Sequence, residues 1–155
     1  MSNQRNQSKM KRLVLFVAIA IASLTAFGQK DYTDFDNLAD VQIKTKIAHT
    51  KSKDASSPLE LSLYFQNTGT KNVIVRYEIF IKDSNGEMRH SGKKEKMLNA
   101  GQKQVGKISG LSYELIGTNI DDYMSGEKQW YFTLLEIKDA ETGEVIATSE
   151  KTREE

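Results

Sequence analysis

The stretch from Leu59 to Gly86 constrains the fold more than any other part of the chain. Its first half alternates apolar and polar side chains, which is typical of a strand with one buried face. The apolar positions are Leu59, Leu61, Leu63 and Phe65. Asn67 and Gly69 then provide a turn, and a run rich in β-branched and aromatic residues, 73–81, ends at a second turn. The stretch predicts a hairpin, and with it a β-sheet protein.

The second strand of this pair is apolar on both faces, although unequally. One face carries only apolar residues, namely Val73, Val75, Tyr77, Ile79 and Ile81. The other face mixes Ile74 and Phe80 with Arg76 and Glu78. A strand that is buried on both faces lies in the middle of a sheet. We therefore predict a central strand whose mixed face lies near an edge or a binding surface.

Further strands are predicted along the rest of the chain at a spacing of eight to twelve residues. The predicted segments are 41–47, 87–96 (a polar edge strand), 105–108, 129–138 and 145–150. Residues 110–126 fit either a strand or a single helical turn, followed by a loop. About seven short strands favour an all-β, immunoglobulin-like β-sandwich, with a small β-barrel as the alternative.

The N-terminus has the features of a secretory signal peptide. Four basic residues precede a ten-residue apolar run, 13–22, and small residues stand at Ala26 and Gly28. The run is too short for a membrane span, which needs roughly 18 to 20 apolar residues. We expect cleavage after residue 28 and export to the periplasm, or alternatively to the extracellular space. The expected division is a signal peptide (1–28), a flexible N-terminal arm (29–39), the sandwich (40–152) and a charged tail (153–155).

Composition narrows the function classes. The chain has no cysteine, so disulfides, thiol catalysis and thiolate metal sites are excluded. The chain without residues 1–28 has 18 basic and 21 acidic residues, a net charge of −3, which argues against a nucleic-acid or membrane-surface role. Basic residues nevertheless gather in the segment 82–107, which has a net charge of +4.

The motifs of enzymes and metal sites are missing from the sequence. His49 and His90 have no second metal ligand at a spacing that one strand or helix would require. Asp121 and Asp122 form a carboxylate pair, but no calcium-loop pattern surrounds them. The sequence contains no G-x-S-x-G elbow and no glycine-rich phosphate loop. We therefore predict a protein that is not an enzyme and binds neither a metal nor a cofactor.

The aromatic triplet Trp130, Tyr131 and Phe132 falls within the last long predicted strand. Alternation places Trp130 and Phe132 on one face, where such residues usually fill a sandwich core. Tyr131 points to the opposite face and is the better candidate for a surface contact.

The basic segment permits two interpretations. Lysines on an edge strand prevent edge-to-edge aggregation. They also attract an acidic or unfolded partner chain. The candidate partner-binding residues are Arg76, Glu78, Arg89, Lys93, Lys94 and Lys96.

Part of the chain resembles a known family. The run 72–82 (NVIVRYEIFIK), the glycine turn after it, the segment 93–98 (KKEKML) and the turn 99–102 are similar to the small periplasmic curli-subunit chaperones of the CsgC and CsgH type. The similarity covers about residues 41–152. Arg76 falls where that family shows an arginine, whereas Val73-Ile74-Val75 replaces the Cys-x-Cys pair of CsgC. A redox role therefore cannot be carried over.

The resemblance implies an immunoglobulin-like sandwich that binds unfolded, curli-like amyloid subunits transiently and inhibits their premature polymerisation. Such a chaperone works as a monomer without ATP, nucleic acid or stable membrane association after signal cleavage. The alternative is a secreted β-sandwich binding module, of the proteinase-inhibitor or adhesion and carbohydrate-binding type. That module would contact a folded partner through its loops.

Overall fold

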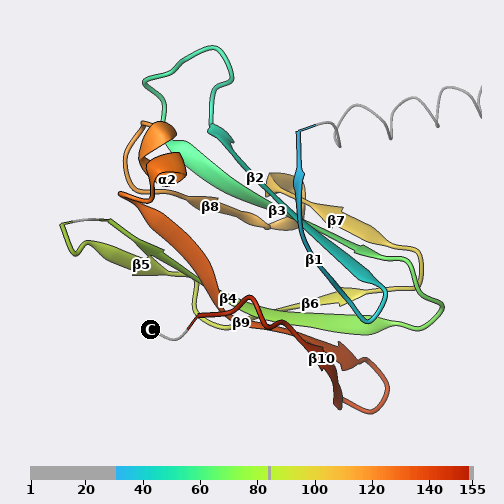
Figure 1. Cartoon of the computed structure of the whole chain (residues 1–155). Helices are drawn as coiled ribbons and strands as arrows, with labels where there is room; N and C mark the ends of the chain where they lie inside the picture. Colours follow the sequence, from blue (N-terminus) through green and yellow to red (C-terminus); the bar gives the residue numbers. More distant parts are fainter. Residues whose placement is uncertain (1–30, 84, 154–155) are drawn as a thin grey trace, which may run out of the picture. The chain divides into compact units, whose positions relative to one another are not determined.

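The structure is a computed structural model that describes residues 31–83 and 85–153. Within these residues the chain forms ten strands, one 3-10 helix and one short α-helix, arranged in two antiparallel sheets (Figure 1). The predicted signal peptide lies outside the described residues. Neither helix in the described ranges combines the length and the apolar character that crossing a membrane requires.

The first sheet has β3 next to one edge. Its order is β1 (Thr33–Leu38), β2 (Val41–His49) and β3 (Leu59–Asn67), followed by two short strands, β7 (Lys103–Val105) and β8 (Ser112–Glu114). Both short strands pair with β3, one after the other. The 3-10 helix η1 (Lys107–Ser109) separates them. This edge of the sheet is therefore a strand broken into two.

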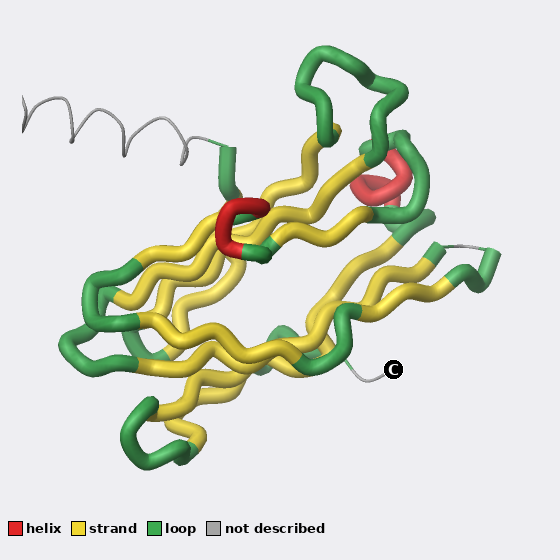
Figure 2. The backbone as a smooth tube through the Cα atoms, turned by 180° about the vertical axis from the view of Figure 1, so that it is seen from behind, coloured by secondary structure: helices red, strands yellow, loops and turns green. Residues whose placement is uncertain are grey.

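The second sheet repeats this arrangement. Its order is β10 (Val145–Thr148), β9 (Gln129–Asp139) and β4 (Val73–Lys82), followed by β5 (Met88–His90) and β6 (Lys94–Leu98), which pair with different parts of β4. The short helix α2 (Asp121–Ser125) lies in the connection from β8 to β9. Figure 2 shows the two sheets as separate layers seen from behind.

The predicted all-β sandwich is confirmed, and the two sheets do not close into a barrel. Several details of the prediction are wrong. Residues 59–67 and 73–82 do not form a hairpin, because β3 and β4 belong to different sheets and the turn between them crosses from one layer to the other. The predicted edge strand 87–96 is two strands. Gly92, with φ of 64°, breaks it, and Ser91 takes over the hydrogen bonds to Ile79.

The arm predicted for residues 29–39 is also wrong where the structure describes it, since β1 occupies residues 33–38 and pairs with β2. Ala39 and Asp40, both with positive φ, form the tight turn that joins the two strands. Phe35 anchors β1, with its ring centroid 5.1 Å from that of Phe132. One aromatic residue among polar neighbours leaves no period-2 pattern, and a bulge between Asp34 and Asp36 disturbs the alternation further.

Alternate residues of β3 and β4 form the centre of the core. Leu61, Leu63 and Phe65 face Val75, Tyr77 and Ile79 between the two sheets, and all six are fully buried. The ring of Tyr77 makes edge contacts with Phe65, Tyr113 and Phe132. Its hydroxyl shares a 2.7 Å hydrogen bond with the hydroxyl of Tyr113, so the one polar atom of this side chain is satisfied. Burial raises the pKa of Tyr77 far above its usual value, and the hydrogen bond contributes.

The raised pKa of Tyr77 predicts a loss of stability in alkaline solution. In the unfolded chain Tyr77 ionises at about pH 10, whereas in the folded chain it stays protonated, so the free energy of unfolding falls as the pH rises above about 10. Tyr77→Phe should reduce the steepness of this fall, measured by urea unfolding from pH 8 to 11. At pH 8 the variant should lose about 1–3 kcal/mol, because the Tyr113 hydroxyl loses its buried partner. An unchanged alkaline slope would contradict the assignment.

Candidate functional site

The outer face of the second sheet, turned away from the core, is ordered in rows that follow the strand register. One row crosses three strands and consists of Glu95 on β6, Arg76 on β4 and Glu136 on β9. Arg76 Nη1 donates to Glu136 Oε1 at 2.9 Å, and Arg76 Nε lies 3.8 Å from Glu95 Oε1. Lys138 Nζ lies 3.7 Å from the same Glu95 oxygen. This charged row therefore balances most of the charge of Arg76 within the sheet.

A second row on the same face is aromatic. His90 on β5, Phe80 on β4 and Tyr131 on β9 stack side by side, with ring centroids 5.7 and 5.9 Å apart and nearly parallel planes. The guanidinium of Arg153 lies 5.7 Å from the centroid of the Tyr131 ring and extends the stack. The predicted outward position of Tyr131 is therefore confirmed, and Phe132, its neighbour, is fully buried.

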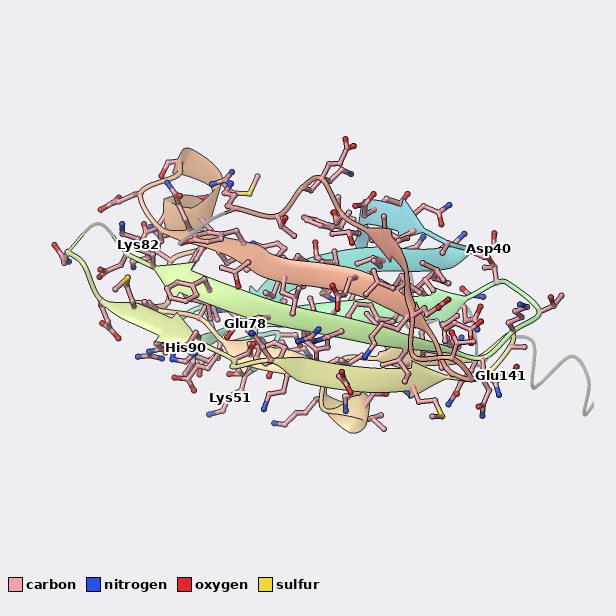
Figure 3. The ribbon with its side chains drawn as sticks, turned by 90° about the horizontal axis from the view of Figure 1, so that it is seen from below. Asp40, Lys51, Glu78, Lys82, His90 and Glu141 are labelled. Atoms are coloured by element: carbon pink, nitrogen blue, oxygen red, sulfur yellow. The ribbon has the colours of Figure 1, made fainter. Side chains whose placement is uncertain are left out.

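Glu78 lies between the two rows. Its Oε1 is 3.8 Å from His90 Nδ1, and the hydroxyl of Thr133 donates to its Oε2 at 3.5 Å. Figure 3 shows Glu78 and His90 close together on this face of the sheet. Only 15% of the Glu78 side chain is exposed, so this carboxylate is largely held by its neighbours.

An open depression of about 550 Å³, which we call the outer groove, lies between the rows. Its lining residues are Arg76, Glu78, Lys93, Thr133, Leu134, Thr152 and Arg153. The segment after β10 forms one wall, because the amides of Ser149 and Arg153 donate to the carbonyls of Leu135 and Phe132, each at 2.9 Å. The C-terminal end of the sandwich, where the sequence predicts only a charged tail from residue 153, is thus part of the groove.

The structure brings together three of the six predicted partner-binding residues. Arg76, Glu78 and Lys93 line the outer groove. Lys94 and Lys96 instead pair with Tyr77 and Val75, whose side chains face the core, so both lysines lie on the inward side of β6. The ammonium of Lys96 donates to the carbonyl of Ser109 at 2.8 Å and ties β6 to η1.

Arg89 is separate from the other predicted residues. Its Nη2 lies 2.9 Å from Oε1 of Glu87, on the same side of the sheet, and its Nη1 lies 3.5 Å from Oε1 of Glu114 on β8. Arg89 therefore connects the broken edges of the two sheets, which is a structural role. The six residues do not form one surface.

Four groove residues were not among the predicted candidates: Thr133, Leu134, Thr152 and Arg153. A bulge explains the first two. The register of β4 and β9 shifts between Glu78 and Ile79, because Glu78 pairs with Leu134 and Ile79 pairs with Phe132. Thr133 is the extra residue of this bulge, and both Thr133 and Leu134 line the groove. Arg153 carries no local signal in the sequence, because its position depends on the path of the chain after β10.

All four sheet edges in the described ranges are short or interrupted. The edge strands β1 and β10 each contain a bulge, and the other two edges are broken by Gly92 and by η1. Inward-pointing lysines on β6 add a further obstacle to strand pairing. An incoming chain therefore meets no long edge in the described part of this domain, whereas the outer face of the second sheet carries the open outer groove.

The other chemically interesting residues have structural partners. Asp121 and Asp122, which fall in the loop predicted at the end of residues 110–126, begin α2 instead, and Asp122 accepts a 2.7 Å hydrogen bond from Lys128, which raises the pKa of Lys128. His49 Nδ1 lies 2.9 Å from the carbonyl oxygen of Ser57. In residues 31–83 and 85–153, no group of three or more His, Cys, Asp or Glu side chains is arranged to hold a metal ion.

Comparison with known proteins finds no matching family model and no significant match among curated proteins. The outer face must therefore be interpreted from its own residues.

The charged row predicts a measurable coupling. Only 11% of the Glu136 side chain is exposed, so Arg76→Met should lower the free energy of unfolding by about 1–3 kcal/mol by leaving this carboxylate without its cation. A double-mutant cycle with Glu136→Gln, measured by urea unfolding, should give a coupling energy of at least about 0.5 kcal/mol. The control is Glu87→Gln, which removes an exposed pair with Arg89 and should cost under about 1 kcal/mol. Additive effects of the two substitutions would show that the row does not act as a unit.

Proposed function

We propose that this chain is an exported, non-enzymatic chaperone that transiently binds unfolded, curli-like amyloid subunits in the periplasm and delays their polymerisation. The observation that carries the proposal is the outer groove, a basic depression on an accessible sheet face of a domain whose edges are all interrupted. The choice of client rests on the family resemblance, and the choice of binding surface rests on the geometry of the outer groove.

The interrupted edges support the proposal for a physical reason. Amyloid subunits polymerise by adding strands to an exposed edge, so a chaperone with a long free edge would be incorporated into the fibre or would serve as its template. Here Gly92, η1 and the bulges of β1 and β10 limit the length over which a client could pair. Contact through a sheet face does not offer the client such a template.

The charge distribution supports contact that is brief and electrostatic. Lys93 and Lys94 are exposed, and neither makes an ion pair with any residue of the described part of the chain. Cations at a surface accelerate encounter with a partner of opposite charge, and the resulting contacts weaken with salt. Such a mechanism requires no nucleotide.

A second function is favoured by one loop. Residues 50–58, between β2 and β3, are held by their own hydrogen bonds, from the Thr50 amide to the Pro58 carbonyl at 2.8 Å and from the Ser57 hydroxyl to the Asp54 carbonyl at 2.7 Å. The loop exposes Lys51 and Lys53. A rigid loop with exposed lysines fits the alternative of a binding module for a folded partner, such as a proteinase. Loss of proteinase activity on titration with the protein would favour this alternative.

The chaperone proposal is tested with a curli-type subunit and thioflavin fluorescence. Wild-type protein at a molar ratio well below one should lengthen the lag before fibres form. Lys93→Glu combined with Arg153→Glu should shorten that lag, because the substitutions reverse two cations that line the groove and form no ion pair with a described residue. Lys96 is left intact because it holds the Ser109 carbonyl.

The matched control is Lys51→Glu combined with Lys53→Glu, which makes the same change of net charge in the loop 50–58. It should leave the lag at the wild-type value. A wild-type protein that does not delay fibre formation would exclude the chaperone function. Equal effects of the two double variants would mean that net charge, rather than this surface, is responsible.

A further inference from the structure

We propose that the outer groove is a binding site for the carboxylate side chains of an extended peptide, with Lys93 and Arg153 as the groups that contact them. The inference deepens the proposed function, because it rests on that function for the source of the peptide. It assigns the client a chemistry, namely acidic residues next to apolar ones, and gives the C-terminal segment a role in recognition.

The balance of charge in the groove favours an anion. Three cations line it, Arg76, Lys93 and Arg153, against one carboxylate, Glu78. Arg76 is already engaged by the two glutamates of the charged row, and Glu78 is held by His90 and Thr133. Lys93 and Arg153 form no ion pair with a described residue. Within residues 31–83 and 85–153, these two cations are left without a carboxylate partner.

Arg153 is held in place before any ligand arrives. Its amide donates to the Phe132 carbonyl at 2.9 Å, its guanidinium lies over the Tyr131 ring, and its Nη1 donates to Gln129 Oε1 at 3.4 Å. A guanidinium that is stacked on an aromatic ring still presents N–H groups along its edge, in a geometry that suits a carboxylate. Because the side chain is already ordered, binding loses less conformational entropy than it would at a flexible lysine.

The floor of the groove indicates that the ligand is a peptide rather than a small anion. The bulge in β9 places a hydroxyl, Thr133, beside an apolar side chain, Leu134. A volume of about 550 Å³ is far more than one carboxylate requires, and lies within the range of sites for small molecules and short peptide segments. A ligand that fills it combines an acidic side chain over the cations with an apolar side chain over Leu134.

The test uses two capped pentapeptides, Gly-Asp-Leu-Asp-Gly and Gly-Asn-Leu-Asn-Gly, titrated into the chain lacking residues 1–28 and followed by amide shifts in NMR spectra. The acidic peptide should shift the amides of Thr133, Leu134, Thr152 and Arg153, with an affinity at least tenfold higher than that of the amide peptide. Arg153→Gln and Lys93→Gln should each weaken the acidic peptide at least threefold. Lys51→Gln should leave the affinity unchanged.

Two results would overturn the inference: equal affinities for the two peptides, or an unchanged affinity in both Arg153→Gln and Lys93→Gln. Both side chains are exposed, so a circular-dichroism spectrum like that of the wild type is expected and separates lost binding from lost folding. The fibre assay distinguishes the two proposals. If wild type and Arg153→Gln delay fibres equally, the chaperone function stands without the groove. If the acidic peptide binds as expected and wild type causes no delay in fibre formation, the outer groove is a peptide site and the chaperone function is excluded.

Discussion

The packing of β3 against β4 across the core is the interaction on which the rest of the structure depends. Alternate residues of the two strands are fully buried, and the Tyr77 ring lies among three other aromatic rings at their centre. Because successive side chains of a strand point to opposite faces of the sheet, the inward position of these residues determines the position of the residues between them. Arg76, Glu78 and Phe80 must then face outward. The charged row and the aromatic row are thus consequences of how the core is filled.

Asn67 links the two sheets at one end of the sandwich. Its buried amide donates to the carbonyls of Lys71, Leu98 and Asn99, and its Oδ1 accepts from the Gly69 amide. One side chain thus joins the end of β3, the crossing turn to β4 and the turn after β6. Two of the three crossings between the layers, β3 to β4 and β6 to β7, are fixed at this point, which holds β6, and with it Glu95 of the charged row, in register beside β4.

The sequence predicted those parts of the fold that depend on local pattern. Leu59–Phe65 and 73–81 alternate clearly, and the core is built from them as expected. The partner of each strand could not be predicted in this way, because a turn sequence such as 67–71 is equally compatible with a hairpin and with a crossing between sheets. The site was predicted only in part for a related reason. Lys93, Lys94 and Lys96 lie close together in sequence, but the strand geometry of β6 separates the groove residue Lys93 from the two inward lysines. Arg153 reaches the groove only through the tertiary path of the chain.

We propose that a client binds the outer face of the second sheet and not an edge or the first sheet. Photo-crosslinking to a monomeric curli-type subunit tests it most directly, with a photoreactive phenylalanine analogue in place of Leu134, of Gln42 on the outer face of the first sheet, or of Ile146 on the edge strand β10. We expect crosslinks from position 134 that decrease with added salt, and few from positions 42 and 146. Equal or stronger crosslinking from position 42 or 146 would contradict it.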